Sequence, residues 1–228
     1  MPEARIVVVD DGSTDHTGRV AGEAGALVLT LPFNMGIGAA VQTGYRYARD
    51  ATAQVAVQMD ADGQHDPATI STLLGPIRRR QADLVIGSRF IQPGGFRSSA
   101  VRRAGIHLLA WLTGMILRRP VTDPTSGFRA CGPRAIALFA ETYPPDYPEP
   151  ESLVMAVRQG LRIEEVAVTM RPRAVGVSSI SPLRAVYYMC KVVYALLCGA
   201  GAADPGARLD GMDRSGQSPP RPSGKRLP

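Results

Sequence analysis

Two aspartates with one residue between them directly follow an apolar run in the first third of the chain. Asp60 and Asp62 follow residues 55–59 (VAVQM), and carboxylates spaced in this way on a loop can converge on one cation. Hard oxygen ligands select Mg²⁺ or Mn²⁺ rather than zinc, and substrate phosphates commonly complete the shell of such an ion. The pattern alone is a weak signal, because Asp62 and Asp66 are equally suited to capping a turn and the next helix.

Polar residues end two further apolar runs. Residues 5–9 (RIVVV) lead into an acidic pair, and residues 82–86 (ADLVI) lead into Gly-Ser-Arg. The first of these runs is short, apolar and rich in β-branched residues, which is typical of a parallel strand buried on both faces. Residues 36–50 have the apolar spacing of a helix and are rich in Ala and Gly, so we expect this helix to pack closely against a sheet.

The order of these elements predicts the fold class. Strands are expected at residues 5–9, 26–31, 55–59 and 82–86, with helices between them. This alternation predicts an α/β fold with a doubly wound, Rossmann-like, mostly parallel sheet. Ligands of such sheets bind beyond the carboxyl ends of the strands. The acidic pairs and the Ser-Arg segment follow those ends, so we expect them at one site.

Size, composition and charge restrict the class of protein. The chain has 228 residues, of which 45% are hydrophobic and 20% charged, as expected for one folded domain with appendages. The net charge of +6 resides at the C-terminal end, where residues 171–198 contain four basic residues and no acid. A neutral body with a basic end suits an anionic surface or a phosphorylated ligand, and no basic run alternates with base-stacking aromatics, so nucleic acid is not an expected partner. The three cysteines are too few for a disulfide framework, which favours a cytoplasmic location.

Two segments are candidates for contact with a membrane. Residues 104–117 are mostly apolar and lie between paired arginines, but a helix of this length is too short to span a bilayer. The segment is either a buried core helix or an interfacial helix with Trp111 at the lipid headgroups. Residues 182–198 are predicted to form an amphipathic juxtamembrane helix, and residues 199–228 a disordered tail.

Five segments together resemble a known family. They are VVVDDGSTDHT (7–17), FNMGIGAAVQTGYRYA (33–48), VAVQMDADGQHDP (55–67), DLVIGSRF (83–90) and DPTSGFRA (123–130). In this order they resemble glycosyltransferase family 2, in the branch of dolichyl- and polyprenyl-phosphate sugar transferases. The resemblance implies a GT-A fold over residues 1–181, C-terminal amphipathic helices, and the absence here of a first strand that relatives usually carry.

The resemblance also implies roles for individual residues. Asp10, Asp11 and Gly36 would lie against the nucleotide of the sugar donor. The cation, Mg²⁺ or Mn²⁺, would be surrounded by Asp60, Asp62 and Gln64, with Asp62 the first choice for a catalytic ligand. Arg89 and Arg129, with Ser126 beside them, would hold the acceptor phosphate. Glu149 and Glu151 resemble an acidic pair that contains the general base in relatives with hydroxyl acceptors, although a solvated acidic turn is an equal interpretation.

The expected activity is metal-dependent, inverting transfer of a hexose from a UDP- or GDP-linked donor to a polyprenyl phosphate. An acceptor phosphate is already anionic and needs no base, and the planar fork of arginine suits phosphate oxygens. The expected location is the inner face of the membrane, with peripheral attachment and a small transmembrane protein as a further candidate partner. Two alternatives remain open, namely transfer to a hydroxyl group and an inactive truncated homologue that acts as a binding protein. His65 is assigned to the start of the helix at Asp66 rather than to a metal.

Overall fold

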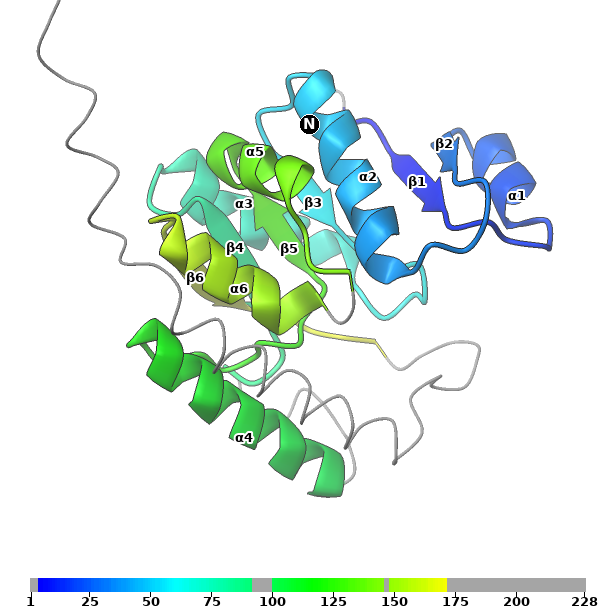
Figure 1. Cartoon of the computed structure of the whole chain (residues 1–228). Helices are drawn as coiled ribbons and strands as arrows, with labels where there is room; N and C mark the ends of the chain where they lie inside the picture. Colours follow the sequence, from blue (N-terminus) through cyan, green and yellow to red (C-terminus); the bar gives the residue numbers. More distant parts are fainter. Residues whose placement is uncertain (1–3, 92–99, 146–147, 172–228) are drawn as a thin grey trace, which may run out of the picture.

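The computed structural model describes residues 4–91, 100–145 and 148–171. It has helices on both faces of a central sheet (Figure 1). The strands are β1 (Val7–Asp10), β2 (Leu27–Thr30), β3 (Ala56–Gln58), β4 (Leu84–Ser88), β5 (Arg129–Cys131) and β6 (Ile163–Ala167). The helices are α1 (Thr17–Glu23), α2 (Ile37–Asp50), the 3₁₀ helix η1 (Pro67–Thr69), α3 (Ile70–Arg78), α4 (Ala100–Leu117), α5 (Pro133–Glu141) and α6 (Pro148–Arg158).

The central sheet has the strand order β3-β5-β4-β6. Strand β5 runs antiparallel to both β3 and β4, whereas β4 and β6 are parallel. Strands β3, β4 and β6 therefore all point the same way and end at one edge. The sheet is mixed rather than mostly parallel, because the short strand β5 is inserted in the opposite direction between two strands of the predicted parallel set.

Strand β4 is the centre of the core, with all five residues buried. Its side chains alternate between two hydrophobic clusters, as the period of two along a strand requires. Leu84 and Ile86 belong to a cluster that also draws residues from α2, α4, α5 and α6. Val85 belongs to a second cluster with Leu73 and Ile77 of α3 on the opposite face. Helices thus cover both faces, which confirms the predicted α/β layering.

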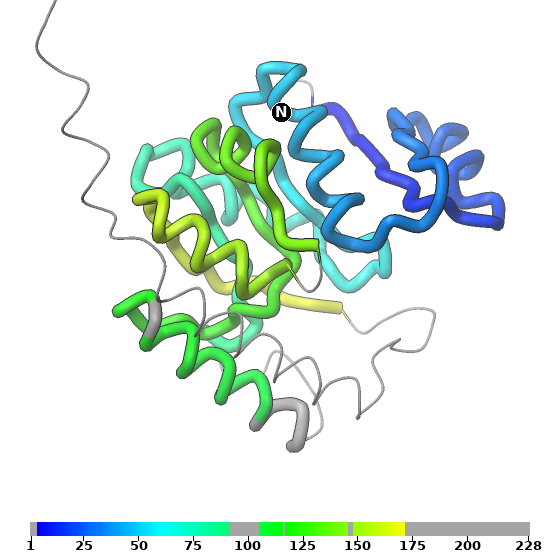
Figure 2. Tube along the Cα trace, in the orientation of Figure 1, coloured from blue at the N-terminus to red at the C-terminus, as the bar shows by residue number. Residues whose placement is uncertain are grey.

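Strands β1 and β2 form a separate two-stranded parallel sheet. They stand with α1 beyond helix α2, which lies between this pair and the central sheet (Figure 2). A Cβ placed on Gly44 of α2 would meet Val9 of β1 at 3.7 Å, and the neighbouring Tyr45 hydroxyl donates to Gln58 of β3 at 3.1 Å. Among the described residues, β1 and β3 each pair with one strand only, so each has one open edge beside the same helix.

Helix α4 starts earlier than predicted, at Ala100, and lies alongside α6 (Figure 1). Ile106, Leu109 and Leu117 are buried, which places one face of the helix in the core. No helix among residues 4–91, 100–145 and 148–171 is both long and apolar enough to cross a bilayer. The predicted juxtamembrane helix at 182–198 and tail at 199–228 lie outside the described residues.

Candidate active site at the carboxyl edge of the sheet

Sheet register brings three of the predicted segments to one edge. The first residue of β5, Arg129, is paired with Gln58 near the end of β3 and with Ile86 near the end of β4. The acidic loop after β3, the Ser88-Arg89 segment after β4 and the Ser126–Arg129 segment before β5 therefore meet. An antiparallel strand places its beginning where its parallel neighbours end, and for this reason a motif before β5 joins motifs that follow β3 and β4.

The acidic loop is compact and internally bonded. The Asp62 carboxylate accepts from the Gln64 backbone N–H at 3.0 Å, and Asp66 caps η1 by accepting from the Ala68 N–H at 3.1 Å. The side chain of Asp60 is 47% exposed. The capping use foreseen from the sequence is present, because Asp66 caps the helix and Asp62 bonds to the turn at Gln64. Asp60 and Asp62 stand at the sheet edge, where the metal-binding use stays a prediction.

The side chain of His65 lies beneath this loop. Its Nδ1 accepts from the Asp60 backbone N–H at 3.0 Å, and its ring stacks on Phe128 with centroids 4.7 Å apart. Burial lowers the pKa of His65 from its ordinary value, against the opposing effect of the Asp60 and Asp62 carboxylates. His65 directly precedes Asp66, the N-cap of η1, but its side chain bonds to the acidic loop and stacks on Phe128.

The side chains at this edge fit a hard divalent cation that is bound partly by the protein and partly by a substrate. The described residues contain no group of three or more His, Cys, Asp or Glu side chains arranged to hold a metal, so a closed structural metal site is not formed there. Asp60 and Asp62 offer carboxylate oxygens on one loop, which suits an ion that uses one or two protein carboxylates and completes its shell with phosphates. Gln64, the third predicted ligand, contributes its backbone N–H to Asp62.

Arg89 is held in a buried ion pair. Its Nε and Nη2 donate to the two carboxylate oxygens of Asp123, both at 2.6 Å, and Nη2 also donates to Thr125 at 2.7 Å. The side chains of Arg89 and Asp123 are 9% and 0% exposed. Glu165 of β6 in turn accepts from the Thr122 and Asp123 backbone N–H groups. The sequence gives no signal for this arrangement, because Asp123 and Glu165 are separated by 42 residues.

Arg129 is fully buried and bonded to the protein, which corrects its prediction as a direct acceptor ligand. Nε donates to the Ser126 carbonyl at 2.8 Å, Nη1 to the Ser152 hydroxyl at 2.7 Å, and Nη2 to the carbonyls of Glu149 and Pro124 at 2.9 and 3.4 Å. A side chain with 0% exposure cannot touch an acceptor in this conformation. The guanidinium group instead ties the start of β5 to the start of α6.

Ser126 has a similar structural part. Its hydroxyl donates to the Gly87 carbonyl at 2.7 Å and accepts from the Phe128 N–H at 3.3 Å, and the residue is 1% exposed. Ser126 therefore joins the end of β4 to the segment before β5. Like Arg129, it does not face an acceptor, because its hydroxyl is buried between two strands.

Glu149 approaches the same edge from the first turn of α6. Burial raises the pKa of Glu149, the Arg129 guanidinium opposes this shift, and the Asp60 carboxylate adds to it. The Glu149 carbonyl accepts from Arg129 at 2.9 Å, which brings the first turn of α6 to the carboxyl edge. Glu151, its predicted companion, is partly buried in the same turn.

The residues predicted to contact the nucleotide of the donor, Asp10, Asp11 and Gly36, form hydrogen bonds within the loops after β1 and before α2. Asp11 accepts from the backbone N–H groups of Met35 and Gly36 at 2.7 and 2.9 Å, which fixes the loop that begins α2. Gly36 has a φ of 92°, a conformation that side chains other than glycine rarely adopt. Asp10 is 6% exposed and accepts from the Ser13 N–H at 3.0 Å. Asp11 and Gly36 thus shape the loop, and Asp10 anchors the turn after β1.

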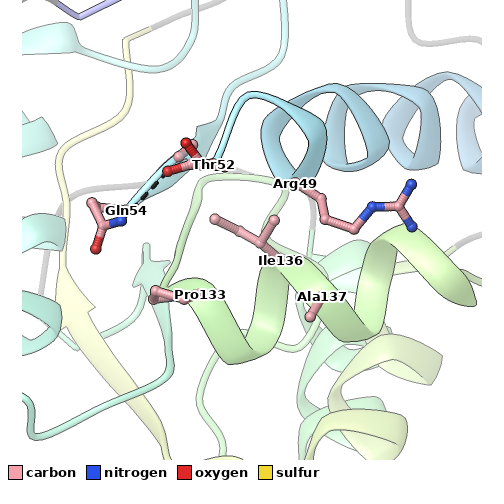
Figure 3. A pocket seen from close by; sticks show the side chains of 7 residues that line it. Arg49, Thr52, Gln54, Pro133, Ile136 and Ala137 are labelled. Carbon is pink, nitrogen blue, oxygen red and sulfur yellow. Dashed lines mark hydrogen bonds between the residues drawn. The ribbon is translucent and has the colours of Figure 1, made fainter.

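A small hollow lies at the opposite end of the sheet. It measures about 210 Å³ between the end of α2 and the start of α5, lined by Arg49, Thr52, Ala53, Gln54, Pro133, Ile136 and Ala137 (Figure 3). Residues 52–54 precede β3 and Pro133 follows β5, so this end carries none of the predicted motifs. The hollow is separate from the carboxyl edge.

Comparisons with known proteins agree with the ordered motifs. The glycosyl transferase family 2 model matches residues 1–139. An undecaprenyl-phosphate mannosyltransferase of Micrococcus luteus is 34% identical over 193 residues, which cover 79% of this chain and 77% of the relative. A UDP-N-acetylglucosamine–dolichyl-phosphate N-acetylglucosaminyltransferase of Methanococcus voltae is 30% identical over 183 residues, covering 72% of this chain and 73% of the relative.

A solved structure supports the same conclusion. The glucosyl-3-phosphoglycerate synthase of Mycobacterium tuberculosis, in complex with Mn²⁺, UDP and phosphoglyceric acid, superposes with a TM-score of 0.63 at 26% identity, over 88% of this chain and 69% of that chain. The predicted GT-A fold is thereby confirmed. A family model that covers well over half of the chain, together with relatives aligned along most of their length, establishes that the chain belongs to glycosyl transferase family 2 and is a glycosyltransferase.

Proposed function

We propose that the chain transfers a hexose, with inversion, from a nucleotide diphosphate sugar to a polyprenyl phosphate. The observation that carries this proposal is the meeting of the Asp60–Asp62 loop with the starts of β5 and α6 at the carboxyl edge of the sheet. Relatives that are 34% and 33% identical are named as an undecaprenyl-phosphate mannosyltransferase and a polyprenol monophosphomannose synthase, which favours a lipid phosphate as acceptor.

In this proposal the sugar–phosphate bond of the donor breaks as an acceptor phosphate oxygen attacks the anomeric carbon. A divalent cation, Mg²⁺ or Mn²⁺, would offset the charge that grows on the departing diphosphate. Asp60 and Asp62 would hold that ion, and Asp11 and Gly36 would shape the loop next to the donor. Arg89 would act on the acceptor phosphate from its ion pair with Asp123 at the end of β4, while Arg129 orients the starts of β5 and α6.

The experiment is sugar transfer by the purified chain. UDP-[¹⁴C]glucose or GDP-[¹⁴C]mannose, Mn²⁺ and undecaprenyl phosphate in detergent should give a radiolabelled lipid that EDTA prevents. Asp62→Ala should remove the product, whereas Asp50→Ala, which changes an exposed carboxylate at the far end of α2, should retain it. Transfer that persists in Asp62→Ala or in excess EDTA would refute the metal-dependent mechanism.

The raised pKa of the Glu149 carboxyl group favours one second candidate, transfer to a hydroxyl acceptor with Glu149 as general base. A base must take the proton of a hydroxyl, whereas a phosphate is anionic already. Glu149→Gln separates the two reactions. A polyprenyl phosphate enzyme should keep most of its turnover, and a hydroxyl transferase should lose about two to four orders of magnitude.

We propose that the enzyme works at a membrane surface through the outer face of α4. Leu108, Trp111 and Met115 are 50%, 59% and 54% exposed and recur at helical spacing. Arg118 and Arg119 follow at the end of the helix and are exposed. An exposed apolar stripe that ends in cations matches an anionic headgroup layer, and the basic, acid-free sequence at 171–198 has the same preference. This supports peripheral attachment at the cytoplasmic face.

Trp111 is the only tryptophan of the chain, so its fluorescence reports on this face alone. Vesicles of phosphatidylglycerol should shift the emission to shorter wavelength and protect it from iodide, while phosphatidylcholine vesicles should have little effect. Unchanged emission with phosphatidylglycerol at low salt would contradict membrane contact through α4.

We propose further that residues 1–181 form a GT-A domain. In this domain one more parallel strand would lie between β1 and β3, on the side of the sheet next to the sugar donor. Strand β1 runs antiparallel to α2, since Val9 lies by Gly44 and Arg5 donates to Tyr47 at 2.7 Å. Strand β3 touches the same stretch of the helix, where Tyr45 bonds to Gln58. They are not bonded to each other, yet they touch one helix that is about 10 Å wide. One strand at the usual spacing of about 4.8 Å would fit between them.

Amide hydrogen exchange tests this opening. The backbone groups of β1 and β3 that face it should exchange far faster than those of β4, which is bonded on both sides. Protection of β1 at the level of β4 would mean that the opening is already filled, and the added strand would then be rejected.

A further inference from the structure

The Asp60 carboxylate is held by residues of two different segments. The Asp60 backbone N–H donates to His65 Nδ1 at 3.0 Å, and Asp60 Oδ2 lies 3.7 Å from His65 Nε2. On its other side, a Cβ added to Gly127 would lie 3.0 Å from both Oδ1 and Oδ2 of Asp60. His65 thus contacts both the main chain and the side chain of Asp60, and the carboxylate occupies space that any side chain at position 127 would enter.

The two restricting residues are themselves rigid. The His65 side chain is 2% exposed and lies almost parallel to the ring of Phe128, at an angle of 12°. Phe128 is 0% exposed and directly follows Gly127, so the support of the His65 ring and the space for the carboxylate both come from the segment just before β5. From the other side, Met170 pairs with His65 across an isolated bridge, and the Arg171 N–H donates to the Gln64 carbonyl at 2.8 Å.

The bonding pattern fixes the form of the imidazole. Nδ1 accepts a hydrogen bond, so the proton of the neutral ring is on Nε2, which faces Asp60. A ring this buried does not reach solvent or a substrate. Its contact with Asp60 therefore concerns where that carboxylate points.

We propose that His65 and Gly127 are positioning residues that orient the Asp60 carboxylate toward a divalent cation arriving with the nucleotide diphosphate. The proposal rests on the proposed function, because it gives Asp60 a cation to hold. Neither residue touches the cation. Gly127 leaves the space that the two carboxylate oxygens occupy, and His65 fixes the main chain from which the carboxylate projects.

Gly127→Ala is a selective perturbation. The φ of Gly127 lies outside the left-handed region, so alanine is compatible with the backbone and its methyl group meets mainly Asp60. The matched control is Gly132→Ala, also at a sheet end, where the added Cβ would have ordinary contacts at 3.5 Å or more. Mn²⁺ binding in the presence of UDP, measured by calorimetry, should weaken about 10- to 100-fold in Gly127→Ala and stay near wild type in Gly132→Ala.

Two replacements of His65 provide an independent test. His65→Phe keeps an aromatic ring to stack on Phe128 but lacks the acceptor, whereas His65→Asn supplies an oxygen near the position of Nδ1 and lacks the ring. His65→Asn should bind Mn²⁺ with UDP more tightly than His65→Phe. Thermal unfolding of each variant shows whether it is folded. If Gly127→Ala does not fold, the comparison of His65→Asn with His65→Phe decides the question.

The outcomes separate the proposals. If the wild type binds UDP without any dependence on Mn²⁺, the proposed function fails and this inference fails with it. If the wild type depends on Mn²⁺, and Gly127→Ala binds the ion equally well or His65→Phe equals His65→Asn, the positioning role is overturned while the proposed function stands.

Discussion

Replacing Asp123 with Asn removes the charge that compensates Arg89. The carboxylate is 0% exposed and bonded to both Nε and Nη2 of the guanidinium at 2.6 Å, and Asn leaves the buried guanidinium without the charge of that carboxylate. Breaking a buried ion pair from one side costs about 3–5 kcal/mol. For a domain of this size the loss corresponds to a fall in Tm of roughly 6–20 °C.

The assay is equilibrium unfolding in urea, with an exposed pair of the same chain as control. Arg19 and Glu23 are 2.6 Å apart, but their side chains are 58% and 61% exposed, so Glu23→Gln should cost less than about 0.5 kcal/mol. Asp123 also fixes the orientation of the Arg89 guanidinium. If sugar transfer depends on that orientation, the Asp123→Asn protein should lose activity as well. Stability within error of the Glu23→Gln variant would refute the reasoning, because the pair would then be worth no more than a surface contact.

Three further predictions concern the frame around the site. Gly38→Ala should destabilise the chain by about 1–3 kcal/mol, because its Cβ would collide with the carbonyls of the loop after α5, while Gly44→Ala in the same helix meets only an ordinary contact; urea unfolding compares the two. Burial raises the pKa of Cys131 to about 11, so with the other two cysteines replaced by serine, Ellman's reagent at pH 8 should react only after urea is added, and reaction in the native state would contradict the buried thiol. Burial of Asp83 is outweighed by the hydrogen bonds and charge of Arg162, which lower the pKa of Asp83. The stabilisation by this carboxylate relative to Asp83→Asn should therefore be constant above about pH 4 and disappear as the pH falls below that value; unfolding free energies that differ equally at pH 3 and pH 6 would show that Asp83 is not preferentially ionised.

Local pattern was sufficient for the parallel part of the fold. The run at residues 5–9 was predicted as a strand buried on both faces; it overlaps β1 but is only partly buried, with Ile6 67% exposed, because α2 and α1 cover it incompletely. The run at 82–86 was predicted as a strand, and β4 there is wholly buried, with its side chains divided between two clusters. The run at 55–59 likewise contains β3, so the position of Asp60 and Asp62 beyond a strand end followed from composition and periodicity. These elements were predictable because their own side chains determine them.

Strand β5 was not predictable in this way. Arg129–Cys131 is three residues long and begins with an arginine, and it is extended because β3 and β4 offer hydrogen bonds on both sides. The burial of Arg129 depends on α6, since Ser152 and the Glu149 carbonyl accept its hydrogen bonds from about twenty residues farther along the chain. A buried cation of this kind depends on tertiary structure, and the motif alone favours the more familiar interpretation as a phosphate ligand.

Arg89 and Arg129, the two arginines at the carboxyl edge, have different hydrogen-bond partners, and this difference determines how each affects a reaction there. Arg89 is bonded to a carboxylate, so its field is largely cancelled near Asp123. The acceptors of Arg129 are carbonyls and a hydroxyl, so its positive charge is solvated by dipoles and is not cancelled by a bonded carboxylate. A buried charge acts more strongly on its surroundings than an exposed one, because little water screens it. Arg129 is therefore suited to stabilise negative charge at the carboxyl edge through space, which differs from its predicted role of holding the acceptor phosphate by direct contact.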